Sequence, residues 1–206
     1  MKNLSGRDQK YLWHPLNQHK LHPGMLGIVR AKGAILYGED GKEYIDGISS
    51  WYTCMYGHCN EMVIERASAQ MRQLDHVIFS GFTHEPAVAL SEALIPLLPS
   101  NQEKLYFSDN GSTATEIGIK MALQYHHNLG VKRSVLLAFE DGFHGDTFGA
   151  MSVSGLSVYN GPFADYFLEV IRIPVPTEEN IDAILYQLEN EIDLESIAGF
   201  IYEPLV

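Results

Sequence analysis

The sequence predicts an α/β fold in which a mostly parallel sheet is flanked by helices. Short apolar runs with the length of buried strands alternate with longer segments whose apolar residues recur every three or four positions. Because parallel strands need crossover connections, this alternation favours a parallel sheet with helices on both faces. The expected strands are 104–108, 134–139, 167–173 and 197–202, and the helices between them are 114–129 and 178–191.

The first 60 residues have a different texture, rich in glycine, aromatic residues and turns. Glu39-Asp40-Gly41 between two strand-like pieces is typical of a hairpin, which predicts a small antiparallel unit rather than a self-sufficient domain. Helical spacing follows, and prolines mark the start and the end of its second helix. The expected strands are 26–31, 35–37 and 43–46, and the expected helices are 62–74 and 86–98.

We expect two domain segments, residues 1–60 from a smaller domain and residues 61–206 from the first part of a larger one. The chain stops directly after the apolar strand 197–202, without a closing helix, so we expect a truncated polypeptide with an incomplete sheet. Apolar surface left uncovered in such a sheet promotes association. We therefore expect the chain to dimerise or aggregate in solution.

Composition excludes several classes of function. The 206 residues hold 14 Lys and Arg against 26 Asp and Glu, and this net charge of −12 argues against a nucleic-acid partner. No stretch approaches the roughly 20 apolar residues of a membrane span, and the N-terminus lacks the apolar core of a secretory signal. Two cysteines, Cys54 and Cys59, predict a cytoplasmic protein, and their spacing around His58 is wrong for a zinc site, so we expect no metal.

Ligands of parallel sheets bind at the carboxyl ends of the strands. After strand 104–108, the turn Gly111-Ser112-Thr113 leads into a helix and offers backbone N–H groups, hydroxyls and the positive end of the helix dipole. This pattern is typical of a phosphate or carboxylate site, although Ser112 or Thr113 could simply cap the helix. A nucleotide P-loop is absent from the sequence.

Three further places carry candidate site residues. Phe143 and His144 lie between two glycines after strand 134–139, where Phe143 can stack on a planar ring or pack as an ordinary core residue. Trp51 and Tyr52 follow the hairpin, either as core residues or as a pair that lines a surface. Glu203 follows the last strand, where a carboxylate can face a ligand or simply stand exposed.

Four motifs in this order resemble those of the class III (ornithine-type) pyridoxal-phosphate aminotransferases, over nearly the whole chain. The resemblance implies an aspartate aminotransferase-like (type I) fold, pyridoxal 5'-phosphate as cofactor, and a homodimeric enzyme. Its reaction moves an amino group from a small-molecule donor to a keto acceptor. The motifs are Tyr44-Ile45-Asp46-Gly47, Phe107-Ser108-Asp109-Asn110-Gly111-Ser112-Thr113-Ala114-Thr115-Glu116, Phe143-His144-Gly145-Asp146-Thr147 and Ile201-Tyr202-Glu203-Pro204.

The resemblance implies a role for each residue that binds the cofactor. Gly111 and Ser112 match the positions that hold its phosphate, in agreement with the helix-terminus argument. Phe143 matches the aromatic residue that stacks on its pyridine ring, and Glu203 matches an acid close to it. These matches place residues 61–206 in the family's large, cofactor-binding domain.

Substrate residues match less closely. Trp51 matches an aromatic residue of the substrate pocket, and Tyr52 stands where a second tryptophan is common. Phe143 also borders the substrate, at a position that often holds a tyrosine, and Leu16 replaces another frequent tyrosine. Stretches 12–20, 49–52 and 144–152 are most similar to the branch of the family that acts in biotin biosynthesis. Ornithine, 4-aminobutyrate and β-alanine types are the alternatives.

The family's chemistry needs a lysine that forms a Schiff base with the cofactor and an aspartate beside the ring nitrogen. None of the chain's eight lysines lies in a matching motif. In the family both groups come from the part of the chain that would follow residue 206. We therefore expect this chain to be inactive alone, and a non-catalytic truncated remnant is the alternative of a different class.

Overall fold

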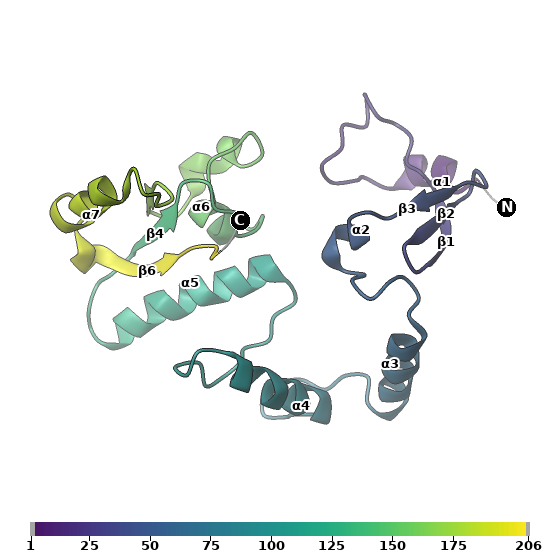
Figure 1. Ribbon diagram of the computed structural model, residues 1–206, viewed down its shortest axis with the longest axis horizontal. Helices are drawn as coiled ribbons and strands as arrows, with labels where there is room; N and C mark the ends of the chain where they lie inside the picture. The colour runs from purple at the N-terminus through teal and green to yellow at the C-terminus, as the bar shows by residue number, and fades with distance from the viewer. Residues whose placement is uncertain (1–2, 205–206) are drawn as a thin grey trace. The chain divides into compact units, whose positions relative to one another are not determined.

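The computed structural model describes residues 3–204, which divide into two compact units. The first unit ends at Ala93 and contains a small antiparallel sheet, and the second begins at Leu94 and contains a parallel sheet (Figure 1). These units are defined by their internal contacts and are not the domains expected from the sequence. The expected domain boundary near residue 60 stays a prediction.

The antiparallel sheet of the first unit consists of β1 (Ile28–Lys32), β2 (Ile35–Gly38) and β3 (Glu43–Ile45), in that order. Between β2 and β3, the N–H of Gly38 donates to the carbonyl of Lys42 (2.9 Å), and the carboxylate of Asp40 accepts from the N–H of Lys42 (3.1 Å). These bonds close the turn that the Glu-Asp-Gly pattern predicts, and the expected hairpin is confirmed.

Four helices complete the first unit. Asn60 starts the third of them, because its side chain accepts from the N–H of Val63. Sequence spacing predicted the third and fourth helices but missed the first, which is short and has no buried residue. The helices are α1 (Leu4–Tyr11), α2 (Ser49–Tyr52), α3 (Glu61–Gln73) and α4 (Glu85–Leu94), the last followed by the 3₁₀ turn η1 (Ile95–Leu97).

The second unit is built on three parallel strands in the order β5-β4-β6. Helices and 3₁₀ turns connect them, which confirms the predicted α/β fold with a parallel sheet. The strands are β4 (Val135–Phe139), β5 (Val170–Ile173) and β6 (Ile197–Ile201). The helices are α5 (Gly111–Asn128), α6 (Phe148–Val153) and α7 (Ile181–Asn190), and the 3₁₀ turns are η2 (Gly161–Tyr166) and η3 (Leu194–Ser196).

The core of the second unit lies on both faces of β4. Leu136 packs with Ile119 of α5 and Val153 of α6, whereas Leu137 points to the other face and packs with Ile184 of α7. Figure 1 shows α5 and α7 on opposite sides of the sheet. Each fully buried aliphatic side chain contributes about 1.5–3 kcal/mol, so β4 is the best-anchored strand. Its carboxyl end therefore provides a firm base for the loop that follows.

Two predicted elements differ in the structure. Residues 104–108 form no strand, because an extended segment becomes one only when a ladder of hydrogen bonds pairs it with a neighbouring strand, and no such strand pairing is formed within residues 3–204. The segment after residue 139, expected as a loop, contains α6. This helix is short, and its first turn is stabilised by a side chain from α5, which local sequence patterns do not reveal.

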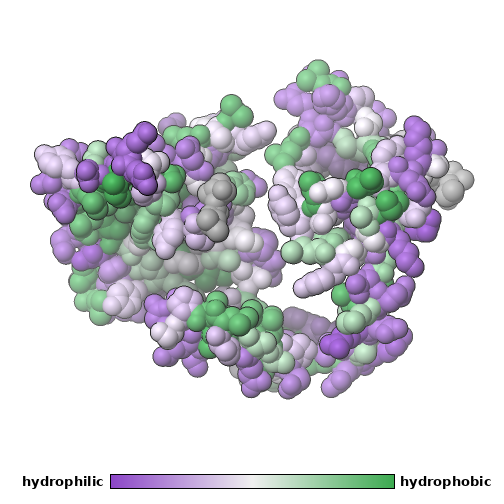
Figure 2. Space-filling model, in the orientation of Figure 1, coloured by the Kyte–Doolittle hydropathy of each residue, from purple (hydrophilic) through white to green (hydrophobic). Residues whose placement is uncertain are grey.

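Large apolar side chains are exposed at several places on the chain. Around α4 and η1, Val88, Leu90 and Leu97 are exposed. Figure 2 shows an apolar, green patch over the region of α4. Among residues 3–204, no helix combines the length and apolarity needed to cross a bilayer.

Candidate active site

The first turn of α5 exposes two backbone N–H groups. Asn110 is the N-cap: its side chain accepts from the N–H of Thr113 (3.0 Å), and the Thr113 hydroxyl accepts from the N–H of Asn110 (3.1 Å). Ser112 is therefore not the cap. The N–H groups of Gly111 and Ser112 donate no hydrogen bond within the described part of the chain. At the positive end of an 18-residue helix, these groups suit an anion.

The loop after β4 packs directly against this helix turn. The N–H of Asp146 donates to the hydroxyl oxygen of Ser112 (3.1 Å), and the Thr115 hydroxyl donates to the carbonyl of His144 (3.0 Å). Gly145 has a φ of +129°, and a Cβ there would lie 2.8 Å from the Cα of Ser112. Because Ser112 accepts from Asp146, its own O–H remains available to donate to a ligand.

Phe143 and Glu203 meet at the carboxyl edge of the sheet. The N–H of Phe143 donates to a carboxylate oxygen of Glu203 (3.0 Å), which joins the segment after β4 to the segment after β6. The Phe143 side chain is 63% exposed, so it is no core residue in this chain. Its exposed ring belongs to the loop that packs against the start of α5. Gly111, Ser112, Phe143 and Glu203 thus belong to one connected group.

His144 is held in the same loop with an unpaired ring nitrogen. Its backbone N–H donates to the hydroxyl oxygen of Ser154 (2.9 Å), while its Nε2 is buried without a hydrogen-bond partner among the described residues. Burial lowers the pKa of this imidazole, and the nearby carboxylate of Glu203 opposes the shift. The turn therefore leaves the hydrogen-bonding capacity of the His144 ring incompletely used.

Charged side chains hold both ends of α6, the helix that follows this loop. Glu116 of α5 accepts from the N–H groups of Gly149 (2.7 Å) and Ala150 (3.2 Å) at its start. Arg172 of β5 donates to the carbonyl of Ser154 (3.1 Å) at its end, and burial lowers the pKa of this guanidinium. Sequence reasoning missed both residues. The sequence feature that could have identified Glu116 is its position four residues after Ser112, which places both residues on the same helix face.

Trp51 and Tyr52 lie in the first unit, on the single turn α2. Their side chains are 68% and 73% exposed, so neither packs into a core of the described residues. Both have left-handed backbone conformations, with φ of 60° and 66°. The expectation that they line a surface is compatible with this exposure, and their contact with a substrate stays a prediction.

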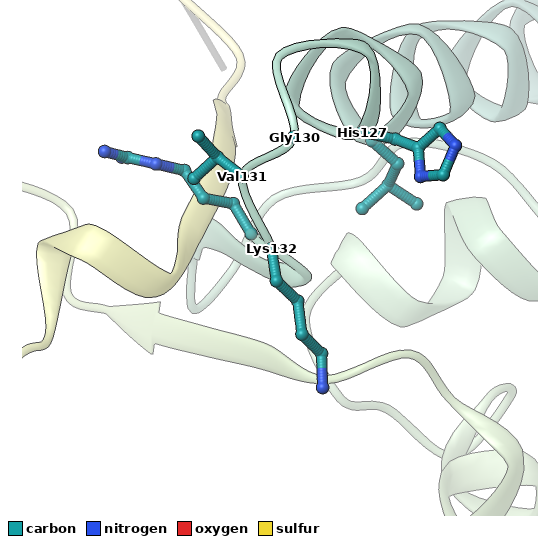
Figure 3. Close-up of a pocket in the computed structure, with 6 residues that line it drawn as sticks. His127, Gly130, Val131 and Lys132 are labelled. Atoms are coloured by element: carbon teal, nitrogen blue, oxygen red, sulfur yellow. The ribbon is translucent and has the colours of Figure 1, made fainter.

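A separate cavity of about 410 Å³ lies at the other end of α5 and contains none of the predicted site residues. Figure 3 shows that its side chains do not converge, since His127 and Lys132 point in different directions. Arg133 is already paired with Glu195 (2.8 Å). Within residues 3–204, no group of three or more His, Cys, Asp or Glu side chains could hold a metal.

The family model described as aminotransferase class-III matches residues 17–206, more than half of the chain. The chain therefore belongs to the class III aminotransferase family. The parallel sheet, the free turn at the start of α5 and the loop after β4 are the parts of this fold that the chain contributes.

Among curated relatives, the chain is 43% identical over 204 residues to an adenosylmethionine-8-amino-7-oxononanoate aminotransferase from Synechococcus elongatus. The match covers 95% of the chain and 48% of the relative. A protein of the same name from Staphylococcus aureus is 34% identical, over 100% of the chain and 49% of the relative. The chain thus spans about half the length of the curated relatives that it matches.

Solved structures give the same result. The chain superimposes with a TM-score of 0.88, at 30% identity, on adenosylmethionine-8-amino-7-oxononanoate aminotransferase from Methanocaldococcus jannaschii, covering 96% of the chain and 45% of that structure. An omega transaminase from Pseudomonas jessenii, solved in complex with PMP, gives a TM-score of 0.82 at 27% identity. That match covers 98% of the chain and 49% of the solved chain.

Proposed function

We propose that the chain forms part of an aminotransferase of biotin biosynthesis. Its reaction transfers an amino group from S-adenosylmethionine to 8-amino-7-oxononanoate and gives 7,8-diaminononanoate. Support comes from relatives named as adenosylmethionine-8-amino-7-oxononanoate aminotransferases, which are 33–43% identical over this chain. Because the chain spans half of their length, the substrates are a proposal for the whole protein, with lysine as the alternative amino donor.

Membership of the family makes pyridoxal 5'-phosphate the cofactor, and the chain's residues fit its two chemical parts. Its phosphate suits the unpaired N–H groups of Gly111 and Ser112 together with the Ser112 hydroxyl. Its planar ring suits the exposed face of Phe143. When bound, the cofactor accepts the electron pair left when a proton leaves the substrate carbon. The observation that carries this proposal is the pair of free N–H groups at the start of α5, against which the loop that carries Phe143 packs.

The remaining residues act by position and charge. Glu203 accepts the backbone N–H of Phe143 and so limits the movement of the segment that carries the ring. His144, kept neutral by burial, adds no positive charge to the loop beneath that ring. Phe143 excludes water from one face of the ligand. Trp51 and Tyr52 contact the substrate in this proposal.

We propose that the lysine that the family bonds to the cofactor has no counterpart among the chain's eight lysines. We propose that the 206 residues bind the phosphate weakly and turn over no substrate by themselves. The low cysteine content supports a cytoplasmic location. We further propose that the full-length protein is a homodimer and that residues 61–206 contribute the first part of its large domain.

The decisive experiment supplies the full-length polypeptide with pyridoxal phosphate, S-adenosylmethionine and 8-amino-7-oxononanoate, and measures 7,8-diaminononanoate. Parallel reactions offer ornithine, 4-aminobutyrate or β-alanine as donor. Formation of the diamine supports the proposal. Turnover of one of the other donors alone would assign another branch of the family, and no turnover with any donor would favour a non-catalytic remnant.

The phosphate site is tested by the Ser112→Ala variant, which removes one donor to the phosphate. We expect pyridoxal phosphate to bind on the order of tenfold more weakly, since a hydrogen bond to a charged group is worth about 1.5 kcal/mol or more. The matched control is Ser100→Ala, an exposed serine outside the site. Equal affinity for both variants, measured by titration of the cofactor absorbance, would contradict the assignment.

A further inference from the structure

The single turn α2 of the first unit is left-handed. Four consecutive residues without a glycine, Ser49 to Tyr52, have φ of 50°, 47°, 60° and 66°. Each left-handed L-residue costs roughly 1–2 kcal/mol, so such a run persists only where its surroundings hold it. The turn has backbone hydrogen bonds of its own, from the N–H of Tyr52 to the carbonyl of Ile48 (2.9 Å) and from the N–H of Cys54 to the carbonyl of Ser49 (2.9 Å). These bonds offset only part of the strain of four left-handed residues.

The carboxylate of Asp46 holds this turn through hydrogen bonds. The hydroxyl of Ser50 donates to it (2.7 Å), and Nε2 of His58 lies 2.7 Å from the same oxygen. The N–H of Ser50, the ring of His58 and the Ser50 hydroxyl hold the pKa of Asp46 well below its usual range. The side chains of His58 and Asp46 are only 15% and 6% exposed, so competing water is largely excluded.

Both supporting residues are fixed to the antiparallel sheet. The N–H of Asp46 donates to the carbonyl of Ala34 (2.9 Å), just before β2. His58 exchanges two backbone hydrogen bonds with Gly33, of 2.8 and 3.0 Å. The strained turn is therefore connected by hydrogen bonds to the antiparallel sheet of the first unit. A residue pair that is half-buried, hydrogen-bonded and anchored in this way can set the direction of the side chains of α2.

Those side chains are the exposed Trp51 and Tyr52. Strained backbone held by a dedicated contact points to a function for the residues it presents. We propose that Asp46, Ser50 and His58 are positioning residues that hold the turn left-handed, so that Trp51 and Tyr52 face the substrate. This inference rests on the proposed function, because it takes these two aromatic residues to contact the substrate.

The conformational part is tested without turnover. Trp13 and Trp51 are the two tryptophans of the chain, so a Trp13→Phe background makes Trp51 the single reporter. We expect Asp46→Asn to change the near-ultraviolet circular dichroism and lower the fluorescence anisotropy of Trp51. Glu65→Gln, an exposed residue of α3, is the matched control and leaves both signals unchanged.

A second variant separates positioning from general stability. Ser49→Gly removes no contact of Asp46, and glycine takes the left-handed form at little cost. Added to Asp46→Asn, it should restore much of the Trp51 signal, whereas it would not repair a general loss of folding. An unchanged signal in Asp46→Asn, or no recovery in the double variant, would overturn the proposal.

The functional part is read in the full-length enzyme as a split between KM and kcat. The KM of the Trp51→Ala variant shows how much KM rises when the substrate contact of Trp51 is lost. We expect Asp46→Asn to raise the KM of one substrate on the order of tenfold, with kcat and cofactor affinity nearly unchanged, and Ser49→Gly to lower it again. If Trp51→Ala raises KM and Asp46→Asn does not, the positioning role fails while the proposed function stands. Absence of turnover in the unmodified enzyme would instead overturn both.

Discussion

Gly145 is the residue whose conformation most directly shapes the loop beside α5. Its φ of +129° is rarely adopted by L side chains, and a Cβ would collide with Ser112. We expect Gly145→Ala to lower the free energy of unfolding by about 3 kcal/mol and to weaken binding of pyridoxal phosphate. Chemical denaturation measures the first effect and absorbance titration the second.

Gly161→Ala is the control for this substitution. Gly161 has an ordinary φ and open space around its Cβ position, so alanine should be tolerated there. If both variants unfolded at the same denaturant concentration, the close approach between Gly145 and Ser112 would not be needed for the fold.

His144 predicts how stability depends on pH. Burial holds its folded-state pKa below the unfolded value of about 6.5, so the unfolded state binds the proton more readily. Its stabilising contribution is complete above that unfolded value and is lost as the pH falls through the folded pKa. Thermal unfolding from about pH 8 down to about pH 5 should show a steeper loss for the unmodified chain than for His144→Gln.

Exposed His22 provides the comparison, since His22→Gln should retain the steep profile. Parallel curves for the unmodified chain and His144→Gln would show that the buried ring does not contribute to the pH dependence.

At the scale of elements, α6 depends on a carboxylate from another helix. Removing Glu116 leaves the N–H groups of Gly149 and Ala150 without an acceptor. We expect Glu116→Ala to destabilise the second unit by about 1–2 kcal/mol, as loss of a helix cap does. The equivalent change at Glu189, exposed on α7, should be nearly neutral in the same denaturation experiment. An intact α6 in Glu116→Ala, seen by hydrogen exchange, would contradict this role.

The elements that sequence patterns predicted are those with local signals. The apolar spacing of α5 located the helix, although its start lies three residues before the predicted position 114, because Asn110 and Thr113 close the first turn. The strand expected at 104–108 is not formed, because strand pairing with this segment does not occur within residues 3–204. Whether a segment pairs as a strand depends on residues far away in the sequence, so the residues of the segment itself do not predict it.

The same distinction applies to the candidate site. Gly111, Phe143 and Glu203 were predicted because carboxyl ends of parallel strands converge. Glu116 was missed because its partner Gly149 lies 33 positions away, and the contact of Asp46 with His58 spans 12 positions. Neither bond follows from spacing within one element.

At the scale of the whole molecule, exposed apolar side chains favour association. They occur in both units and include Val88 and Leu97, and Figure 2 shows an apolar patch over the region of α4. We expect the isolated 206 residues to form dimers or larger species at moderate concentration, and more so in high concentrations of sulfate, which strengthens apolar contacts. Light scattering measures this directly. A stable monomer under both conditions would contradict the prediction.

The central position of β4 has a consequence for how the second unit opens. Its backbone is bonded to a strand on each side and covered by helices on both faces, so water reaches its amides only when the unit as a whole unfolds. In deuterium oxide, the amide protons of Leu136 to Ala138 should therefore be the last to be replaced. Their rate would report the global unfolding equilibrium, while the turn at the start of α5 exchanges early and leaves the anion site accessible.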